Sequence, residues 1–341
     1  MKNIVNLGNV ATYINGYAFK PSDWAEDGTP IIRIQDLTGN SYQMNRFKGI
    51  VDSKYDVNSG DVLISWSASL GVYVWNRGNA VLNQHIFKVV FDKEEVDKDF
   101  FVFQIDNLLK RAANQAHGAT MRHLTKPVFD ALPFYLPDIK TQRLISSKLN
   151  LIVHLIEDHH EQLKKLDELI RSRFLEMFGD IELNSQNMQK MMWQEVFDTQ
   201  TGKLDANAAV KGGRYPFFTC AKEISTIDEY AYDCEALLLA GNNAVGDYDV
   251  KYYKGKFNAY QRTYILMLKN RQYSYSVFKF QLEQKLRYLQ LQSKGTNTRY
   301  LTMGILRSLD FIVPPIVKQQ EFAQFVNATD KSKMAIQKSL D

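Results

Sequence analysis

The chain repeats itself at a constant offset of 177 in the residue numbering, and this internal repeat constrains its fold more than any other feature. The stretch "HGATMRHLTKPVFDALPFYLPDIKTQ" ends at Gln142, and "KGTNTRYLTMGILRSLDFIVPPIVKQ" ends at Gln319. At the same offset Arg122 corresponds to Arg299. A two-copy duplication within 341 residues predicts two similar domains rather than a solenoid of short repeats.

Upstream of this region the offset in the numbering becomes 186. Gly16 then corresponds to Gly202, and "PII" at 30–32 corresponds to "PFF" at 216–218. A change of offset requires an insertion in the first copy. We therefore expect variable loops between residues 37 and 84.

Both copies follow the same α/β plan. Short apolar runs predict strands, among them "PIIRIQ", "DVLISWSA" and "HIFKVVF" in the first copy and "EALLLAG" and "TYILML" in the second. A helix is predicted next, over "KDFFVFQIDNLLKRAANQA" or "SYSVFKFQLEQKLRYLQLQS", and a glycine at 118 or 295 closes it. After a strand bounded by proline, a long helix begins near residue 139 or 316.

The long helices carry a heptad pattern, and the first would be about 60 Å long at about 1.5 Å per residue. Polar His159 corresponds to apolar Ile336, whereas apolar Ile156 corresponds to polar Lys333. This complementarity predicts that the helices pair with each other; the alternative is that each packs on its own domain. The predicted seam consists of Ile145, Leu149, Ile152, Ile156, Leu163, Leu166, Ile170, Phe322, Val326, Ile336 and Leu340.

These features resemble the DNA specificity subunit of a type I restriction–modification system, over essentially the whole chain. The most specific segments are "LPDIKTQRLISSKLNLIVHLIEDHHEQLKKLDELIRSRFLEMFGD" and "VPPIVKQQEFAQFVNATDKSKMAIQKSLD", which resemble the spacer helices of that family. The resemblance implies that each variable domain reads one half of a split site in double-stranded DNA. It also implies that the paired helices hold the domains apart and bind two methyltransferase subunits. Restriction/translocase subunits would complete the complex, and S-adenosylmethionine, ATP and Mg would be used by those other subunits.

The expected fold class is α+β, with two tandem α/β target recognition domains separated by long helices that pair as an antiparallel coiled coil with pseudo-two-fold symmetry. The second helix ends at Asp341, the counterpart of Lys164, and is therefore shorter than the family pattern. The expected division is a first recognition domain at 1–138, a central spacer helix at 139–178, a linker at 179–190, a second recognition domain at 191–315 and a shortened distal helix at 316–341.

Motifs for catalysis are missing from the sequence. There is no phosphate-binding loop of the G-x-x-x-x-G-K-[ST] type and no Asn-Pro-Pro-aromatic motif of an amino-methyltransferase. Cys220 and Cys234 lack metal-ligand spacing, and no metal site is expected. There is also no apolar run of membrane-spanning length, and a cytoplasmic protein is expected. Because the catalytic motifs are missing, we expect the protein to bind rather than to catalyse.

Binding to DNA needs cations for phosphates and amide, hydroxyl or guanidinium groups for base edges. Residues 190–313 hold 17 Lys and Arg against 12 Asp and Glu, whereas residues 1–138 hold 14 against 15. The same residues in solvated hairpins are the competing interpretation, and the loops around Gly118 and Gly295 fit either a phosphate clamp or a simple turn. The candidate DNA contacts are Arg33, Gln35, Arg46, Lys48, Ser67, Asn76, Arg77, Asn83, Gln84, Arg122, Lys211, Arg214, Asn242, Asn243, Lys251, Tyr253, Lys254, Gln261, Arg262 and Arg299.

Three functions are compatible with the sequence. The first is a non-catalytic reader of a bipartite DNA site, which the resemblance favours. The second is a self-contained DNA methyltransferase or nuclease fusion, against which the missing motifs argue. The third is a coiled-coil scaffold that binds only protein.

Overall fold

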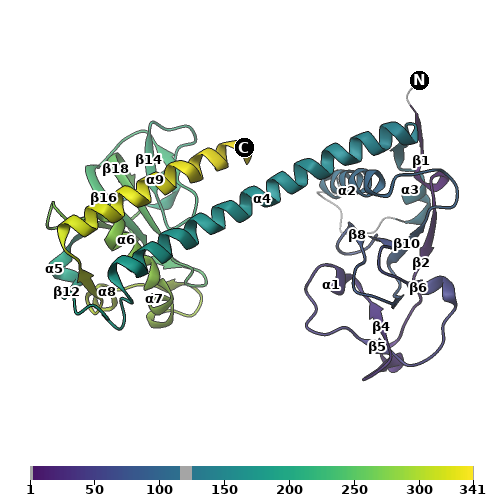
Figure 1. Cartoon of the computed structure of the whole chain (residues 1–341), viewed down its shortest axis with the longest axis horizontal. Coiled ribbons are helices and arrows are strands. Elements are labelled where there is room, and N and C mark those ends of the chain that lie inside the picture. Colours follow the sequence, from purple (N-terminus) through teal and green to yellow (C-terminus); the bar gives the residue numbers. More distant parts are fainter. Residues whose placement is uncertain (1–2, 116–124, 341) are drawn as a thin grey trace. The chain divides into compact units, whose positions relative to one another are not determined.

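The computed structural model describes residues 3–115 and 125–340, and its contacts divide the chain into two units, Met1–Leu155 and Ile156–Asp341 (Figure 1). Each unit is described by itself. The helix α4 (Ile139–Phe178) begins in the first unit and ends in the second. No helix within the described ranges is both long and apolar enough to cross a bilayer.

The first unit contains two main sheets and a covering helix. A four-stranded sheet has the order β2-β10-β7-β8, and a five-stranded sheet has the order β3-β5-β4-β9-β6. The strands are β1 (Ile4–Asn6), β2 (Thr12–Asn15), β3 (Trp24–Ala25), β4 (Thr29–Ile32), β5 (Arg46–Phe47), β6 (Asp56–Val57), β7 (Val62–Ser65), β8 (Gly71–Val74), β9 (Ala80–Leu82), β10 (Ile86–Val90) and β11 (Pro133–Tyr135). The helices are α1 (Ile34–Leu37), α2 (Lys98–Gln115), α3 (Lys126–Asp130) and the start of α4.

The second unit is built around one six-stranded sheet with the order β13-β19-β16-β18-β14-β15. Its strands are β12 (Gln189–Met192), β13 (Phe197–Thr201), β14 (Tyr215–Phe218), β15 (Ser225–Ile227), β16 (Tyr232–Ala240), β17 (Asn242–Asn243), β18 (Val250–Ala259), β19 (Thr263–Leu268), β20 (Arg299–Tyr300) and β21 (Asp310–Val313). Its further helices are α5 (Trp193–Val196), α6 (Tyr275–Gln284), α7 (Leu286–Gln292), α8 (Met303–Arg307) and α9 (Ile316–Leu340). The single helix predicted at 274–293 is thus divided at Lys285, whose N–H is shared between the carbonyls of Gln281 and Leu282.

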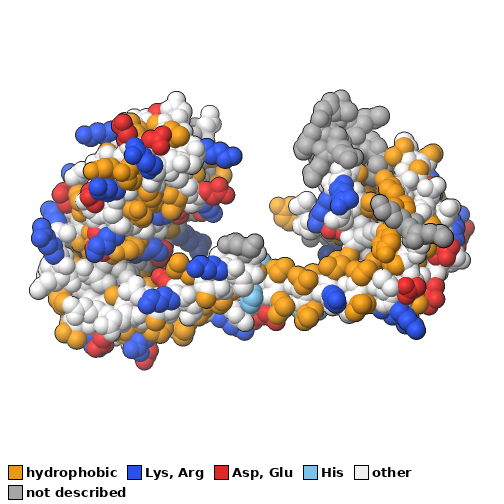
Figure 2. All heavy atoms as spheres, turned by 90° about the horizontal axis from the view of Figure 1, so that it is seen from above, with side chains coloured by type: hydrophobic (Ala, Val, Ile, Leu, Met, Phe, Trp, Pro, Cys, Tyr) orange, Lys and Arg blue, Asp and Glu red, His pale blue; other side chains and the backbone are white. Residues whose placement is uncertain are grey.

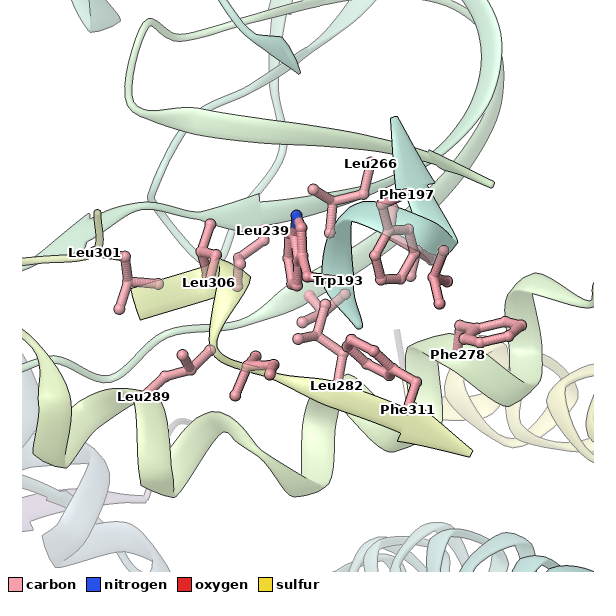
Figure 3. Packing of buried hydrophobic residues seen from close by; sticks show 14 of the residues in the cluster. Trp193, Phe197, Leu239, Leu266, Phe278, Leu282, Leu289, Leu301, Leu306 and Phe311 are labelled. Atoms are coloured by element: carbon pink, nitrogen blue, oxygen red, sulfur yellow. The ribbon is translucent and has the colours of Figure 1, made fainter. Parts of the chain in front are cut away.

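Aromatic side chains fill the core of both units. In the first, Phe101 and Phe134 are fully buried with ring centroids 5.5 Å apart. In the second, Trp193, Phe278 and Phe311 lie in one cluster between the sheet and α6 (Figure 3). Burying such large apolar surfaces supplies most of the driving force for folding each unit.

Strand pairing confirms the repeat residue by residue. Asn15 of β2 faces Phe87 of β10, and Thr201 of β13 faces Tyr264 of β19. These pairs reproduce both offsets found in the sequence, the longer one before the insertion and the shorter one after it. In both units a parallel pair, β4 with β9 or β14 with β18, joins the two offset regions.

The insertion in the first copy lies between β4 and β7. Ile32 and Ser65 are 33 positions apart, whereas their counterparts Phe218 and Ala240 are 22 apart. The strands β5 and β6 of this stretch have counterparts, because Arg46 pairs with Pro30 as Thr226 pairs with Pro216, and Val57 pairs with Ala80 as Tyr232 pairs with Phe257. The additional chain includes α1, which has no equivalent helix between β14 and β15. The second copy has two additional residues before β19, so the net change of offset is nine.

A close backbone crossing requires glycine at the same place in both copies. A Cβ atom on Gly16 would lie 2.0 Å from the carbonyl oxygen of Asn83, and one on Gly202 would lie 2.1 Å from that of Ala259. No side chain fits at such distances. The match of these two glycines therefore reflects a shared crossing of chain segments.

The helices α4 and α9 pack antiparallel within the second unit (Figure 1). Phe174 of α4 contacts Phe322 of α9 with ring centroids 5.3 Å apart. Further along α9, Lys333 Nζ lies 2.6 Å from Asp167 Oδ1, and Ser339 Oγ lies 3.2 Å from the His159 ring nitrogen Nδ1. Increasing numbers in α9 meet decreasing numbers in α4, as antiparallel helices require.

This arrangement confirms the predicted fold class of two α/β repeats with paired long helices. Where α9 covers α4, the predicted seam is half-buried at Leu163, Leu166 and Ile170. Ile152 and Ile156 are exposed, and Ile145 packs against the core of the first unit. The division into domains at 138/139 and the role of each seam position stay predictions.

Replacing Phe322 with alanine should destabilise the helix pair strongly. Phe322 is fully buried against Phe174, Phe178 and Phe280, and such a truncation costs about 3–5 kcal/mol of unfolding free energy. Denaturant unfolding followed by circular dichroism measures it, with Met334→Ala on the exposed side of the same helix as control. Equal unfolding midpoints for the two variants would contradict this packing.

Candidate nucleic-acid interface

Several loops of the second unit meet at one end of its sheet. We call residues 219–222, 241–249, 260–262 and 297–300 the second loop end. The Gly241 N–H donates to the carbonyl of Arg262 at 2.8 Å, and the Cys220 thiol donates to the same oxygen at 3.6 Å. The short strands β17 and β20 pair with each other. These contacts bring together segments that are far apart in the sequence.

Many of the candidates predicted in the second copy lie at this loop end. Asn242, Asn243, Gln261, Arg262 and Arg299 belong to its loops. The ammonium group of Lys251 reaches it as well, donating to the Ala221 carbonyl at 2.9 Å.

Three of these side chains are engaged in holding the loops. The amide oxygen of Asn243 accepts from the N–H groups of Val245 (2.9 Å) and Asp247 (3.3 Å). Arg299 donates to the Gln290 carbonyl at 3.3 Å, and Lys251 forms an ion pair with Asp249. In contrast, Gln261 and Arg262 are exposed and Asn242 is half-buried.

Lys222 is a cation at the second loop end that the sequence analysis missed. Its ammonium group lies 2.6 Å from Asp247 Oδ2, and the side chain is 74% exposed. The hydrogen bond to Asp247 raises the pKa of Lys222, whose ammonium group is in any case charged at neutral pH. Its place just after the buried run "PFF" was the available signal, because residues that follow a sheet strand are presented at the end of the sheet.

The other candidates of the second unit lie elsewhere on it. Lys211 and Arg214 are exposed in a turn beside β15, where Arg214 donates to the Asp228 carbonyl at 3.0 Å. Tyr253 packs its ring on Phe218. Lys254, in the middle of β18, lies 3.1 Å from Glu235.

Glu235 also accepts a hydrogen bond from the hydroxyl of Tyr252, at 2.7 Å. Burial, together with this bond to a carboxylate, holds the pKa of Tyr252 well above its usual value. The phenol therefore remains a neutral donor at physiological pH.

The first unit has an equivalent end, the first loop end, formed by residues 33–36, 66–70 and 83–85. Here the Trp66 N–H donates to the His85 carbonyl at 3.3 Å, at the positions that Gly241 and Arg262 occupy in the second unit. One backbone hydrogen bond of the second loop end is therefore repeated in the first, although the local backbone differs, since His85 has a positive φ of 73°.

The candidates at the first loop end differ in accessibility. Gln35 is exposed, Asn83 and Gln84 are half-buried, and Ser67 is 5% exposed. Arg33 caps α1 instead of continuing the predicted strand "PIIRIQ".

The side chain of Arg33 is already paired within the fold. Its Nε lies 3.7 Å from the carboxylate of Asp36, and its guanidinium lies 5.5 Å from the Trp24 ring centroid. Because Arg33 retains only 17% of its side-chain exposure, the pair contributes to the fold itself.

The remaining candidates of the first unit lie away from its loop end. Asn76 and Arg77 are exposed in the turn before β9, with the Arg77 guanidinium 5.5 Å from the ring centroid of Trp75. Arg46 donates to the Gly28 carbonyl at 2.8 Å, and Lys48 lies 2.9 Å from Asp27. Arg122 lies outside the described residues.

The chemistry of both loop ends is that of hydrogen bonding and charge. Within residues 3–115 and 125–340, no group of three or more His, Cys, Asp or Glu side chains is arranged to hold a metal ion. Amide groups at both loop ends, together with the exposed cations Lys222 and Arg262 at the second, describe a tandem-repeat protein suited to binding a polar ligand.

Sequence comparison identifies the family. Residues 2–168 and 185–341 match the model of the type I restriction modification DNA specificity domain, and the chain belongs to this family. The matched ranges follow the two copies of the repeat.

Curated relatives are similar over part of their length. The chain is 38% identical over 132 residues to the type I restriction enzyme EcoDI specificity subunit of Escherichia coli, a match that covers 38% of this chain and 28% of that protein. It is 25% identical over 170 residues to the EcoBI specificity subunit of the same species, covering 49% and 35%. The chain therefore spans about a third of the length of these relatives.

A solved structure shows the same fold. The S subunit of a type I restriction–modification system from M. genitalium superposes with a TM-score of 0.62 at 15% identity, covering 99% of this chain and 91% of the other. At this identity the likeness concerns the fold alone.

Proposed function

We propose that this protein is the non-catalytic subunit of a type I restriction–modification complex that recognises a bipartite sequence in double-stranded DNA. The observation that carries the proposal is the pair of equivalent loop ends with different side chains. Ser67 corresponds to Asn242 and His85 to Arg262 at equivalent places of the repeat. A protein that reads two different half-sites needs this combination of a common frame and unlike contacts.

The side-chain chemistry supports a duplex as the ligand. Arginine pairs with guanine, and asparagine or glutamine pairs with adenine, through two hydrogen bonds each in the major groove. Gln261 and Arg262 are exposed at the second loop end. We assign them to base edges, and we assign Lys211, Arg214 and Lys222 to phosphates, which position the protein without reading sequence.

The exposed face of α4 supports a protein partner. Leu144, Leu151, Ile152, Leu155 and Ile156 are each between 41% and 60% exposed. Figure 2 shows hydrophobic side chains gathered along this stretch of helix. Contiguous exposed apolar surface of this kind is typical of protein interfaces.

We assign this face to methyltransferase subunits, two of them in the complete complex, which restriction/translocase subunits then join. S-adenosylmethionine, ATP and Mg belong to those subunits in this proposal. The chain itself then supplies binding and selectivity, while the chemistry takes place elsewhere.

Methylome sequencing tests the proposed function. A host that expresses this chain with its modification partner should gain methylation at a motif of two short defined sequences separated by a fixed, undefined gap. A host with the modification partner alone is the control. Methylation at an undivided motif, or unchanged methylation, would refute the proposal.

Replacing Arg262 with alanine should affect one half-site only. Loss of one paired contact to a base costs about 1–3 kcal/mol and relaxes specificity at that position. Binding to duplexes that carry each possible base in the affected half-site measures it. Lys331→Ala, which removes an exposed cation of α9, serves as control. A uniform loss across all duplexes would assign Arg262 to a phosphate instead.

Replacing Leu151 and Leu155 together with glutamate should abolish assembly and leave duplex binding intact. Two carboxylates in an apolar interface lose their hydration without gaining partners. Co-purification with the modification subunit and mobility shift of duplex DNA measure the two properties. Val317→Glu, an equally exposed position at the start of α9, is the control. Unchanged co-purification would place the docking surface elsewhere.

A further inference from the structure

Four glutamines at equivalent positions of the two units join helices to neighbouring segments by side-chain hydrogen bonds. Gln104 and Gln142 lie in the first unit, and their counterparts in the repeat, Gln281 and Gln319, lie in the second. In each unit one glutamine lies in the first turn of a long helix, and the other joins a shorter helix to a strand.

Gln142 ties the first turn of α4 to two other segments. Its Oε1 accepts from the Asp97 N–H at 2.9 Å, just before α2. Its Nε2 donates to the carbonyls of Pro137 at 2.8 Å and Glu95 at 3.3 Å. The side chain is 1% exposed, so these bonds are shielded from water.

Gln319 repeats this clamp in the second unit. Its Oε1 accepts from the Ser274 N–H at 2.9 Å, just before α6, and its Nε2 donates to the Pro314 carbonyl at 2.7 Å. Gln319 is fully buried. Asp97 and Ser274 are themselves counterparts in the repeat, so the same joint is built from otherwise different sequences.

Gln104 and Gln281 each make two side-chain amide hydrogen bonds to the backbone of a single strand residue. Gln281 donates to the Ile312 carbonyl at 3.0 Å and accepts from its N–H at 2.9 Å. Gln104 makes the same pair of bonds with Tyr135, at 2.9 and 2.8 Å. These bonds join α6 to β21 and α2 to β11, and neither touches a long helix.

Because a buried amide with both its donor and its acceptor engaged tolerates little rotation, the clamp at Gln142 holds the direction in which α4 leaves the first unit. The clamp at Gln319 holds the first turn of α9, which packs along α4 inside the second unit through Phe322 and Lys333. A helix of 40 residues is about 60 Å long at about 1.5 Å per residue. A tilt of about 5° at its first turn displaces the far end by roughly 5 Å, more than the rise of about 3.4 Å per base pair. A small change in the angle of the helix at the clamp therefore moves its far end by more than the rise of one base pair.

We propose that Gln142 and Gln319 are positioning residues that set how strictly the protein discriminates the gap between its two half-sites. This inference rests on the proposed function. Gln281 is as fully buried as Gln319 and is the matched control, while Gln104 is half-buried; neither is expected to affect gap discrimination.

The test uses the complete complex of this chain with its modification subunits. The substrates are duplexes that carry both half-sites found by methylome sequencing, with gaps from two base pairs shorter to two longer. For each gap the initial methylation rate is measured. The ratio of the rate at the natural gap to the rate at a gap altered by one base pair is the readout.

For Gln142→Leu and for Gln319→Leu this ratio should fall at least five-fold. For Gln104→Leu and Gln281→Leu, which lose equivalent hydrogen bonds, it should remain that of the unaltered protein. Should a leucine variant fail to fold, the corresponding methionine variant, closer in shape to glutamine, replaces it in the same measurement.

Two outcomes overturn the inference. One is that all four variants keep the unaltered ratio; the other is that all four lower it equally, which would assign the clamps to general stability. If the unaltered protein methylates no bipartite motif at all, the proposed function fails instead, and that result is distinguishable from both.

Discussion

The whole arrangement depends on one close crossing of backbone, which occurs once in each repeat. At Gly16 and at Gly202 the chain passes a neighbouring carbonyl at a distance that leaves no room for a Cβ atom. The crossing brings the segment after β2 or β13 against the segment before β10 or β19, as the bonds from the Gln84 N–H to Tyr17 and from the Gln261 N–H to Leu204 show. Without it the loops of each loop end would not meet. The position of the surface loops thus depends on the local backbone geometry at these glycines.

A frame of this kind separates stability from selectivity. One main-chain hydrogen bond is shared by the two loop ends, from Trp66 to His85 and from Gly241 to Arg262, whereas the side chains presented there differ. Gly241 marks a limit to such change, because a Cβ atom there would lie 2.2 Å from the Arg262 carbonyl oxygen. The same separation explains why Arg33 and Lys251, both cations at a loop end, are poor guides to binding. Each is mostly buried in an ion pair with an aspartate, Asp36 or Asp249, and serves the frame.

Much of the fold could be predicted from the sequence because the duplication provided two independent views of it. The bounds of α4 and its antiparallel pairing with α9 follow from the offset and from the complementary seam, whereas only some of the strands were predicted and the helix at 274–293 was predicted undivided. The pairing of Arg33 and the burial of Ser67 could not be predicted, since both depend on tertiary contacts that a single sequence does not display. Gln104 and Gln281 were also overlooked. Their match is one identity among many differences, and only the bonds to Tyr135 and Ile312 reveal its meaning.

The polar residues in the helix seam can be understood in the same terms. An entirely apolar seam would allow α9 to slide along α4 by one heptad, about 10 Å at about 1.5 Å per residue. Lys333 opposes this, because its ion pair with Asp167 forms in one register only, and Ser339 meets His159 in that same register. Such a slip would separate Lys333 from Asp167 and leave its partly buried ammonium group with only the longer contact to Asp330 on the same helix, at 3.8 Å. Polar seam positions thus give up some stability and specify a single register. A register error of about 10 Å corresponds to about three base pairs of duplex at about 3.4 Å each. In the proposed function, in which the gap between two half-sites is read, the register of this seam therefore has to be specified as strictly as the clamps at Gln142 and Gln319.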